Sequence, residues 1–191
     1  MTSESLLSVG VGLALAAAAG FRVFVPLLAL SLAARGGWVE LSASFDWLGT
    51  TPAAVALGTA TALEIAAYYI PFFDNMLDTL TAPVAVLAGI VASASLLTDL
   101  PPWLQYSIAV IGAGGTAGVV HASTSMLRLK SSAATAGIGN PILATLELAG
   151  SVLIAVLALL APFIALAAVI ALVGFVARRV NARRVARQRT A

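Results

Sequence analysis

The chain alternates between long apolar runs and short breaks that carry glycine, proline and polar residues. A helix needs about 20 mostly apolar residues to cross the hydrocarbon core of a bilayer. The pattern therefore predicts an all-α fold, a polytopic transmembrane bundle. The apolar runs that predict its helices are Ser5–Ala34, Pro52–Ile70, Ala82–Thr98, Leu104–Leu127 and Pro141–Val176.

The last run is longer than one crossing requires, and it contains Pro162. Proline inside a helix removes a backbone hydrogen bond and favours a break. The run therefore forms one long helix, two short spans that turn at Ala161–Pro162, or a half-helix followed by one span. The chain then has five or six spans. Six agrees better with the positive-inside rule, because Arg128, Lys130 and the C-terminal arginines then share one side.

Breaks within the apolar runs predict interrupted helices near Arg22–Pro26, Pro71–Asp78 and Gly137–Pro141. Irregular backbone at membrane depth is tolerated only where it is buried in protein or lines a cavity. We therefore expect these broken helices to surround a polar interior.

Two segments suggest an internal repeat, because Thr61–Ala66 resembles Ala144–Ala149 and each follows a span that carries an arginine. A three-plus-three arrangement would give the two halves opposite topology, as in transporters built from inverted repeats. Alanine- and leucine-rich sequences also produce such similarity by chance. Both interpretations stay open.

Composition supports the membrane assignment. Of 191 residues, 61% are hydrophobic and 9% are charged, whereas soluble domains carry about 25% charged residues. Cysteine is absent and there is one histidine, so disulfides, thiolate metal sites and histidine metal cages are excluded. No hydrolase or nucleotide-binding motif is present. We expect no cofactor, and an enzyme acting on a lipid is only a third alternative.

Positive charge gathers at the C-terminus, where six arginines lie between Arg178 and Arg189. Such a tail binds nucleic acid or an anionic surface in some proteins. Here it follows an apolar run directly, so we interpret it as a cytoplasmic topology anchor with no nucleic-acid partner. Residues 1–177 form one transmembrane domain, and residues 178–191 form the basic tail.

Charged and amide residues lie within or beside the apolar runs. Ionisable groups at membrane depth cost about 2.5–3.5 kcal/mol each on insertion scales and usually face a partner or a water-filled cavity. They are therefore the candidate site residues: Arg22, Glu64, Asp74, Asn75, Asp78, His121, Arg128, Asn140 and Glu147.

Glu64 and Glu147 are predicted to be coupling carboxylates, with Arg22 and Arg128 as their counter-ions. Tyr68 follows Glu64 by one helical turn, so its phenol could hydrogen-bond the carboxylate. The alternative is a buried Glu64–Arg22 ion pair that only fixes helix packing.

Asp74, Asn75 and Asp78 offer oxygen ligands of the kind that hard cations prefer. In a helix, Asp74 and Asp78 would share a face. The alternative is a solvated loop at the membrane surface.

Two helix faces carry further polar residues. His121, Ser125 and Arg128 form one stripe, which lines an aqueous path, binds an anionic headgroup or joins helices by hydrogen bonds. Asn140 and Glu147 share a face of the following helix. Asn140 would serve there as a ligand or as a helix cap.

The chain resembles a bacterial family of small integral membrane proteins known as domain of unknown function 4126. Three motifs carry the resemblance, which covers Leu13–Pro162: Gly20–Pro26; Glu64–Pro71 followed by Asp74, Asn75 and Asp78; and Gly139–Pro141 followed by Glu147. The resemblance implies a multi-pass protein of the bacterial inner membrane. It implies no activity, substrate or catalytic residue.

These patterns predict a small secondary transporter or channel-like carrier for a cation or small polar solute. The alternative is a protein that binds a lipid headgroup or a membrane-protein partner, with structural ion pairs. Its partners would be the bilayer, the transported solute and, in one alternative, further copies of the chain, since so few spans make a thin wall around a pathway.

Overall fold

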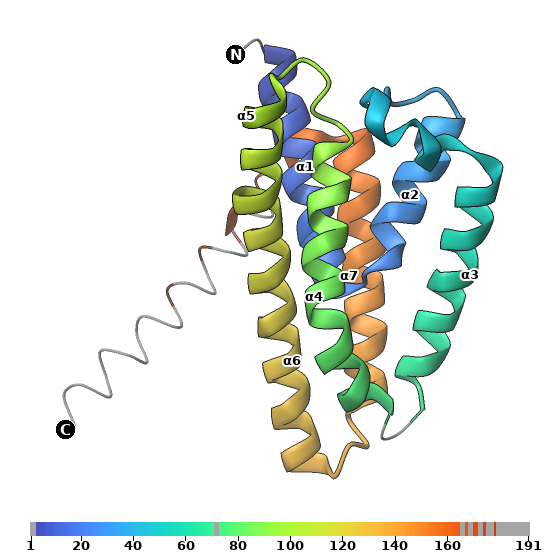
Figure 1. Cartoon of the computed structure of the whole chain (residues 1–191). Helices are drawn as coiled ribbons and strands as arrows, with labels where there is room; N and C mark the ends of the chain where they lie inside the picture. The colour runs from blue at the N-terminus through green and yellow to red at the C-terminus, as the bar shows by residue number, and fades with distance from the viewer. Residues whose placement is uncertain are drawn as a thin grey trace.

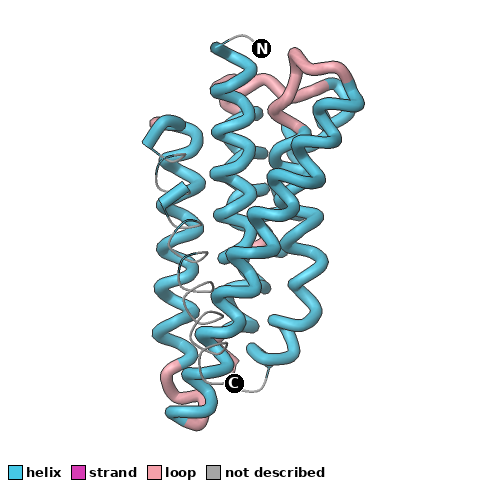
Figure 2. The backbone as a smooth tube through the Cα atoms, turned by 90° about the vertical axis from the view of Figure 1, so that its left-hand side faces the viewer, coloured by secondary structure: helices cyan, strands magenta, loops and turns pink. Residues whose placement is uncertain are grey.

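The computed structural model of the chain describes residues 3–70 and 73–164, with residues 167, 170, 171, 174 and 178 beyond them. Within this part of the chain the backbone forms helices and loops only (Figures 1 and 2). The side chains of Asp74 and Asn75 and the tail from Arg179 to Ala191 lie outside the described residues. The helices are α1 (Ser3–Phe21), α2 (Phe24–Arg35), η1 (Ala43–Gly49), α3 (Thr51–Tyr68), α4 (Phe73–Ala94), α5 (Pro102–Ser107), η2 (Ile108–Gly114), α6 (Gly115–Thr135) and α7 (Asn140–Leu160).

The long helices lie side by side in one bundle (Figure 1). In the described part of the chain, four helical segments are long and apolar enough to cross a membrane: Glu4–Phe21, Met76–Ala94, Pro102–Thr135 and Asn140–Leu160. The third joins α5, the π-helical turn η2 and α6. The protein is therefore an all-helical, membrane-embedded bundle. Five or six spans and an internal repeat are not confirmed.

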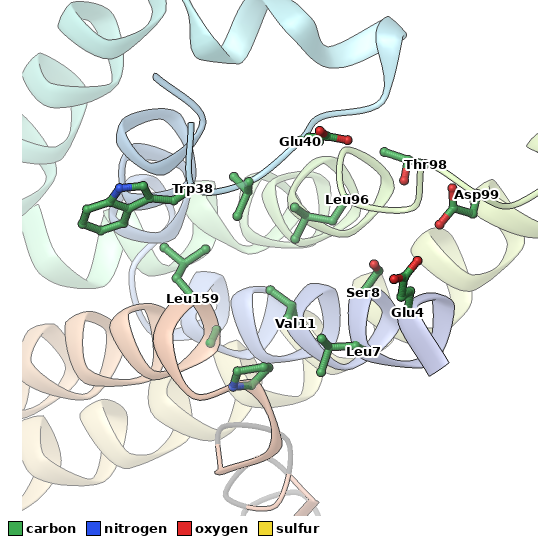
Figure 3. A pocket seen from close by; sticks show the side chains of 13 residues that line it. Glu4, Leu7, Ser8, Val11, Trp38, Glu40, Leu96, Thr98, Asp99 and Leu159 are labelled. Carbon is green, nitrogen blue, oxygen red and sulfur yellow. The ribbon is translucent and has the colours of Figure 1, made fainter. Parts of the chain in front are cut away.

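The run Ser5–Ala34, predicted as one interrupted span, forms two helices that fold back on each other. The start of α1 and the residues after α2 lie at the same end of the bundle, where Glu4, Trp38 and Asp99 line one pocket (Figure 3). The chain therefore reverses at Arg22–Val23. Both residues are buried, so the tip of the α1–α2 hairpin lies inside the protein.

Small side chains let α1 occupy the middle of the bundle. Each residue from Ala14 to Ala19 is fully buried, with 0% exposure. Gly89 of α4 lies so close that a Cβ there would sit 3.2 Å from the Cβ of Ala16 and 2.8 Å from that of Ala117. Small residues at helix contacts are the usual means of close packing in membranes.

Helix ends follow local chemistry. α7 ends at Leu160, because Ala161 leaves the helical conformation directly before Pro162. This excludes the single long helix among the three alternatives for Pro141–Val176. The predicted break at Gly137–Pro141 is present, with Ala136 and Gly137 at positive φ between α6 and α7.

Exposed tryptophans gather at one end of the bundle. Trp38, Trp47 and Trp103 are 74%, 53% and 70% exposed. Hydrogen bonds join the segments near them, since Ser42 N donates to Ser95 O and Gln105 Nε2 donates to Ala94 O. Tryptophan favours the membrane–water boundary, so the residues at this end are of the kind found at a membrane interface.

Candidate functional site: a buried polar centre

Seven polar side chains meet inside the bundle, and we call this group the polar centre. All are buried except Asp78, whose side chain is 13% exposed. They come from the α1–α2 turn and from four further helices. The members are Arg22, Glu64, Tyr68, Asp78, His121, Arg128 and Glu147.

Glu64 holds the tip of the α1–α2 hairpin. Its carboxylate oxygens accept hydrogen bonds from Val23 N at 2.8 Å and Phe24 N at 3.1 Å. The first N–H groups of a helix lack intrahelical acceptors and favour a negative charge. Glu64 therefore compensates the start of α2 from the neighbouring helix α3.

Glu147 joins the two arginines. Arg128 Nη2 donates to Glu147 Oε2, and Arg22 Nη2 lies 3.7 Å from the same oxygen. Arg22 Nη2 also donates to Ala144 O at 2.9 Å. Glu147 therefore lies beside both arginines, whereas the carboxylate of Glu64 accepts from the backbone amides of Val23 and Phe24.

Tyr68 lies between the arginines and Asp78. The guanidinium carbons of Arg22 and Arg128 stand over its ring, 3.8 and 4.2 Å from the centroid. Its hydroxyl donates to Asp78 Oδ1 at 3.1 Å, and Arg128 Nε lies 3.5 Å from Asp78 Oδ2. Sequence reasoning placed the phenol beside Glu64 and did not identify Tyr68 as a site residue. The only signal for Tyr68 in the sequence was its position one helical turn after Glu64.

The two predicted polar stripes are buried helix faces. On α6, His121, Thr124 and Arg128 face inward. His121 Nε2 lies 3.1 Å from the carbonyl oxygen of Asp78, which can only accept, so Nε2 carries the proton. On α7, Glu147 and Ser151 are buried, and Ser151 Oγ donates to Ala18 O at 2.9 Å.

The remaining predicted ligands lie elsewhere or are not described. Asn140 Nδ2 donates to Ser132 Oγ at 2.8 Å, at the turn between α6 and α7. Asp74 and Asn75 belong to α4, but their side chains lie outside the described residues. Within the described chain, no group of three His, Cys, Asp or Glu residues could hold a metal ion.

The charges of the polar centre nearly balance. Glu64 faces the amino end of α2, while Asp78 and Glu147 face Arg22 and Arg128. Arg22 still has buried donors, Nε and Nη1, with no acceptor in the described part of the chain. A buried donor without a partner costs about 1–3 kcal/mol. These two donors of Arg22 can therefore bind an oxygen-bearing group.

Comparisons with known proteins address the family of the chain. No curated protein and no solved structure matches it. One family model matches residues 9–182, which is most of the chain. The model is that of the family which the motifs around Arg22, Glu64 and Asn140 resemble. The chain therefore belongs to the family described as domain of unknown function (DUF4126).

Proposed function

We propose that the chain is a small secondary transporter for a cation or small polar solute, with the polar centre as its binding site. The observation that carries the proposal is the α1–α2 hairpin, which reverses inside the protein beside Arg22, Glu64 and Glu147. Transporters place their sites where discontinuous helices expose backbone and charged groups near the middle of the bilayer. A purely structural helix pair has no need of such a break.

The geometry favours different roles for the two glutamates. Glu147 contacts both arginines, so protonation there would remove the negative charge that the two guanidinium groups share. We propose Glu147 as the coupling carboxylate and the unsatisfied Nε and Nη1 of Arg22 as the donors to an oxygen of the solute. Glu64 is engaged by the backbone of α2, so we assign it to anchoring the hairpin.

We further propose the bacterial inner membrane as the location, with the basic tail in the cytoplasm. Lys130 lies near the end of α6, opposite the end that carries the tryptophans. The positive-inside rule favours the same side for Lys130 and the arginine-rich tail. The tryptophan end would then face away from the cytoplasm.

A second function has one observation in its favour. Asp78 and Glu147 balance Arg22 and Arg128, and Glu64 is balanced by helix amides. A self-compensated network of this kind also serves proteins that only bind a lipid headgroup or a membrane partner. In that case the polar centre fixes the fold and no solute reaches it.

Purified protein in sealed vesicles separates the two functions. A pH-sensitive dye inside the vesicles reports proton movement when gradients of small polar solutes are applied one at a time. Transport predicts a solute-dependent signal with the wild type and none with Glu147→Gln, while both have the same helical circular dichroism. Glu40→Gln is the control, since Glu40 is an exposed acid at the tryptophan end.

The opposite result is also clear. If the wild type gives no signal with any solute, and Glu147→Gln loses its helical structure at a lower temperature, the network is structural. The binding function would then replace transport.

A further inference from the structure

The second half of α3, residues 59–68, is attached to the bundle in a different way from the first half. α3 stands at the edge of the bundle, beside α2 (Figure 1). In the described part of the chain, the main cluster of apolar side chains receives one residue from α3, the partly buried Leu57. Beyond Leu57 the buried side chains of α3 are all polar: Thr61, Glu64 and Tyr68. The inward face of the second half is therefore polar.

Hydrogen bonds from side chains join this half to its neighbours. Glu64 accepts from two backbone amides of the α1–α2 turn. The hydroxyl of Tyr68 donates to Asp78 of α4. Directly after α3, the hydroxyls of Tyr69 and of Thr145 of α7 lie 2.7 Å apart. Such bonds add little net free energy, because water can replace either partner. This contact can therefore open where water enters.

The first half of α3 is fixed to α2. Leu48, which precedes it, is fully buried in the main apolar cluster. The carbonyl oxygen of Leu48 accepts from Ser31 Oγ of α2 at 2.6 Å. Arg35 Nη1, at the end of α2, donates to Thr51 Oγ1 at 2.6 Å. A movement of the second half would therefore leave the start of α3 in place.

Gly58 separates the two halves, and close packing does not require a glycine there. A Cβ at this position would meet one atom, Leu28 Cδ1, at 4.0 Å, which is ordinary contact. Glycine makes the interior of a helix less stable, because its backbone adopts many conformations. Gly58 is therefore the position at which α3 bends most easily.

We infer that the second half of α3 is a gate on the polar centre, which bends at Gly58 and is held shut by the hydrogen bond between Tyr69 and Thr145. Opening withdraws Glu64 from the two amides and the ring of Tyr68 from both guanidinium groups. Water and a solute then reach the polar centre. The inference rests on the proposed function, since transport requires access to a buried site.

The test measures amide hydrogen exchange at Val23 and Phe24 in the purified full chain. Both N–H groups are bonded to Glu64, so they exchange when the gate opens. Tyr69→Phe removes the hydroxyl that holds the gate and should speed their exchange about fivefold, the equivalent of one hydrogen bond. Gly58→Ala should slow it about two- to fivefold, because alanine favours the straight helix.

Matched controls separate the gate from general effects of the substitutions. Tyr106→Phe removes the hydroxyl of an exposed tyrosine, and Gly150→Ala adds a Cβ that meets nothing within 4 Å. Both should exchange as the wild type does. Glu64→Ala should exchange faster and shows that the measurement responds. Circular dichroism verifies that each variant is folded.

The gate is overturned if Tyr69→Phe and Gly58→Ala exchange at the wild-type rate while Glu64→Ala exchanges faster. Equal rates in all variants also overturn it, because the two amides would then not depend on α3. Exchange requires no solute, so this result is separate from transport. Exchange that responds as expected, in a protein that moves no solute, would contradict transport and leave the gate in place.

Discussion

At the scale of single residues, the polar centre depends on how two buried guanidinium groups are accommodated. Arg22 and Arg128 are 1% and 2% exposed. Buried charges are tolerated only with partners of good geometry. The carboxylate of Glu147 forms ion pairs with both arginines, and both guanidinium groups stand over the polarisable ring of Tyr68. Tyr68 is therefore as much a part of the network as the carboxylates.

Replacing Tyr68 separates its two contributions. Tyr68→Phe removes the hydroxyl that donates to Asp78 and should lower the free energy of unfolding by about 1 kcal/mol. Tyr68→Leu also removes the ring beneath the arginines and should cost about 1–2 kcal/mol more. Denaturant titration in detergent measures both. Equal losses for the two variants would contradict a role for the ring, and Tyr106→Phe, at an exposed tyrosine, is the control.

Replacing Glu64 tests whether it anchors the hairpin. Glu64→Gln keeps one oxygen for the amides of Val23 and Phe24, whereas Glu64→Ala leaves both without an acceptor. We expect amide hydrogen exchange at these two residues to be slow in the wild type, faster with Gln and fastest with Ala. Thr59→Ala, on an exposed part of the same helix, should leave it unchanged. Unchanged exchange in Glu64→Ala would remove the anchoring role.

Most members of the polar centre could be predicted from the sequence, but their partners could not. Arg22, Glu64, Arg128 and Glu147 are conspicuous because charge is rare in apolar runs. Which carboxylate meets which arginine depends on where α1 turns back, and hydropathy carries no information on that turn. Tyr68 was missed because tyrosine is common in membrane helices.

At the scale of elements, the spacing of polar residues along a helix predicted which face is buried, but the sequence did not predict where the chain reverses its direction. Asn140 and Glu147 were predicted to share a face of one helix, and both are buried on α7 together with Ala144 and Ser151. The fold-back of α2 was not predicted, because Ser5–Ala34 is apolar almost throughout. The π-helical turn η2 has no sequence signal that we recognise.

Close packing of α4 against α1 and α6 predicts opposite effects for two glycines. A Cβ at Gly89 would meet Ala117 Cβ at 2.8 Å, whereas a Cβ at Gly115 would meet nothing within 4 Å. Gly89→Ala should therefore lower the free energy of unfolding by about 1–3 kcal/mol. Gly115→Ala should raise it by about 0.5–1 kcal/mol, because alanine favours the helix. Thermal or denaturant unfolding measures both, and a stabilising Gly89→Ala would refute the packing.

At the scale of the whole molecule, one end of the bundle is distinguished by its aromatic residues. The chain has three tryptophans, and all three are exposed near the start of α1 and the end of α4. The opposite end holds the turns between α3 and α4 and between α6 and α7. The polar centre lies between these ends, and two of its members, Asp78 and His121, line a pocket beside it.

This asymmetry makes tryptophan fluorescence a test of orientation. In vesicles with uniformly oriented protein, iodide added to one side should quench nearly all of the emission or nearly none, because all three residues share an interface. A large quenched fraction together with a large protected fraction would mean that the tryptophans occupy both interfaces.

The most direct measurement asks whether water reaches the polar centre, and it uses the absence of native cysteine. Ala144→Cys places a thiol on the buried face of α7, where the Ala144 carbonyl contacts Arg22. Leu146→Cys places one on the same helix at a position that is 63% exposed on the outside of the bundle, where we expect lipid. A membrane-impermeant thiol reagent is then applied to sealed vesicles from each side.

Transport predicts that Ala144→Cys reacts, from one defined side, while Leu146→Cys does not. If Ala144→Cys stays unlabelled from both sides in folded protein, the polar centre is dry and transport through it is contradicted.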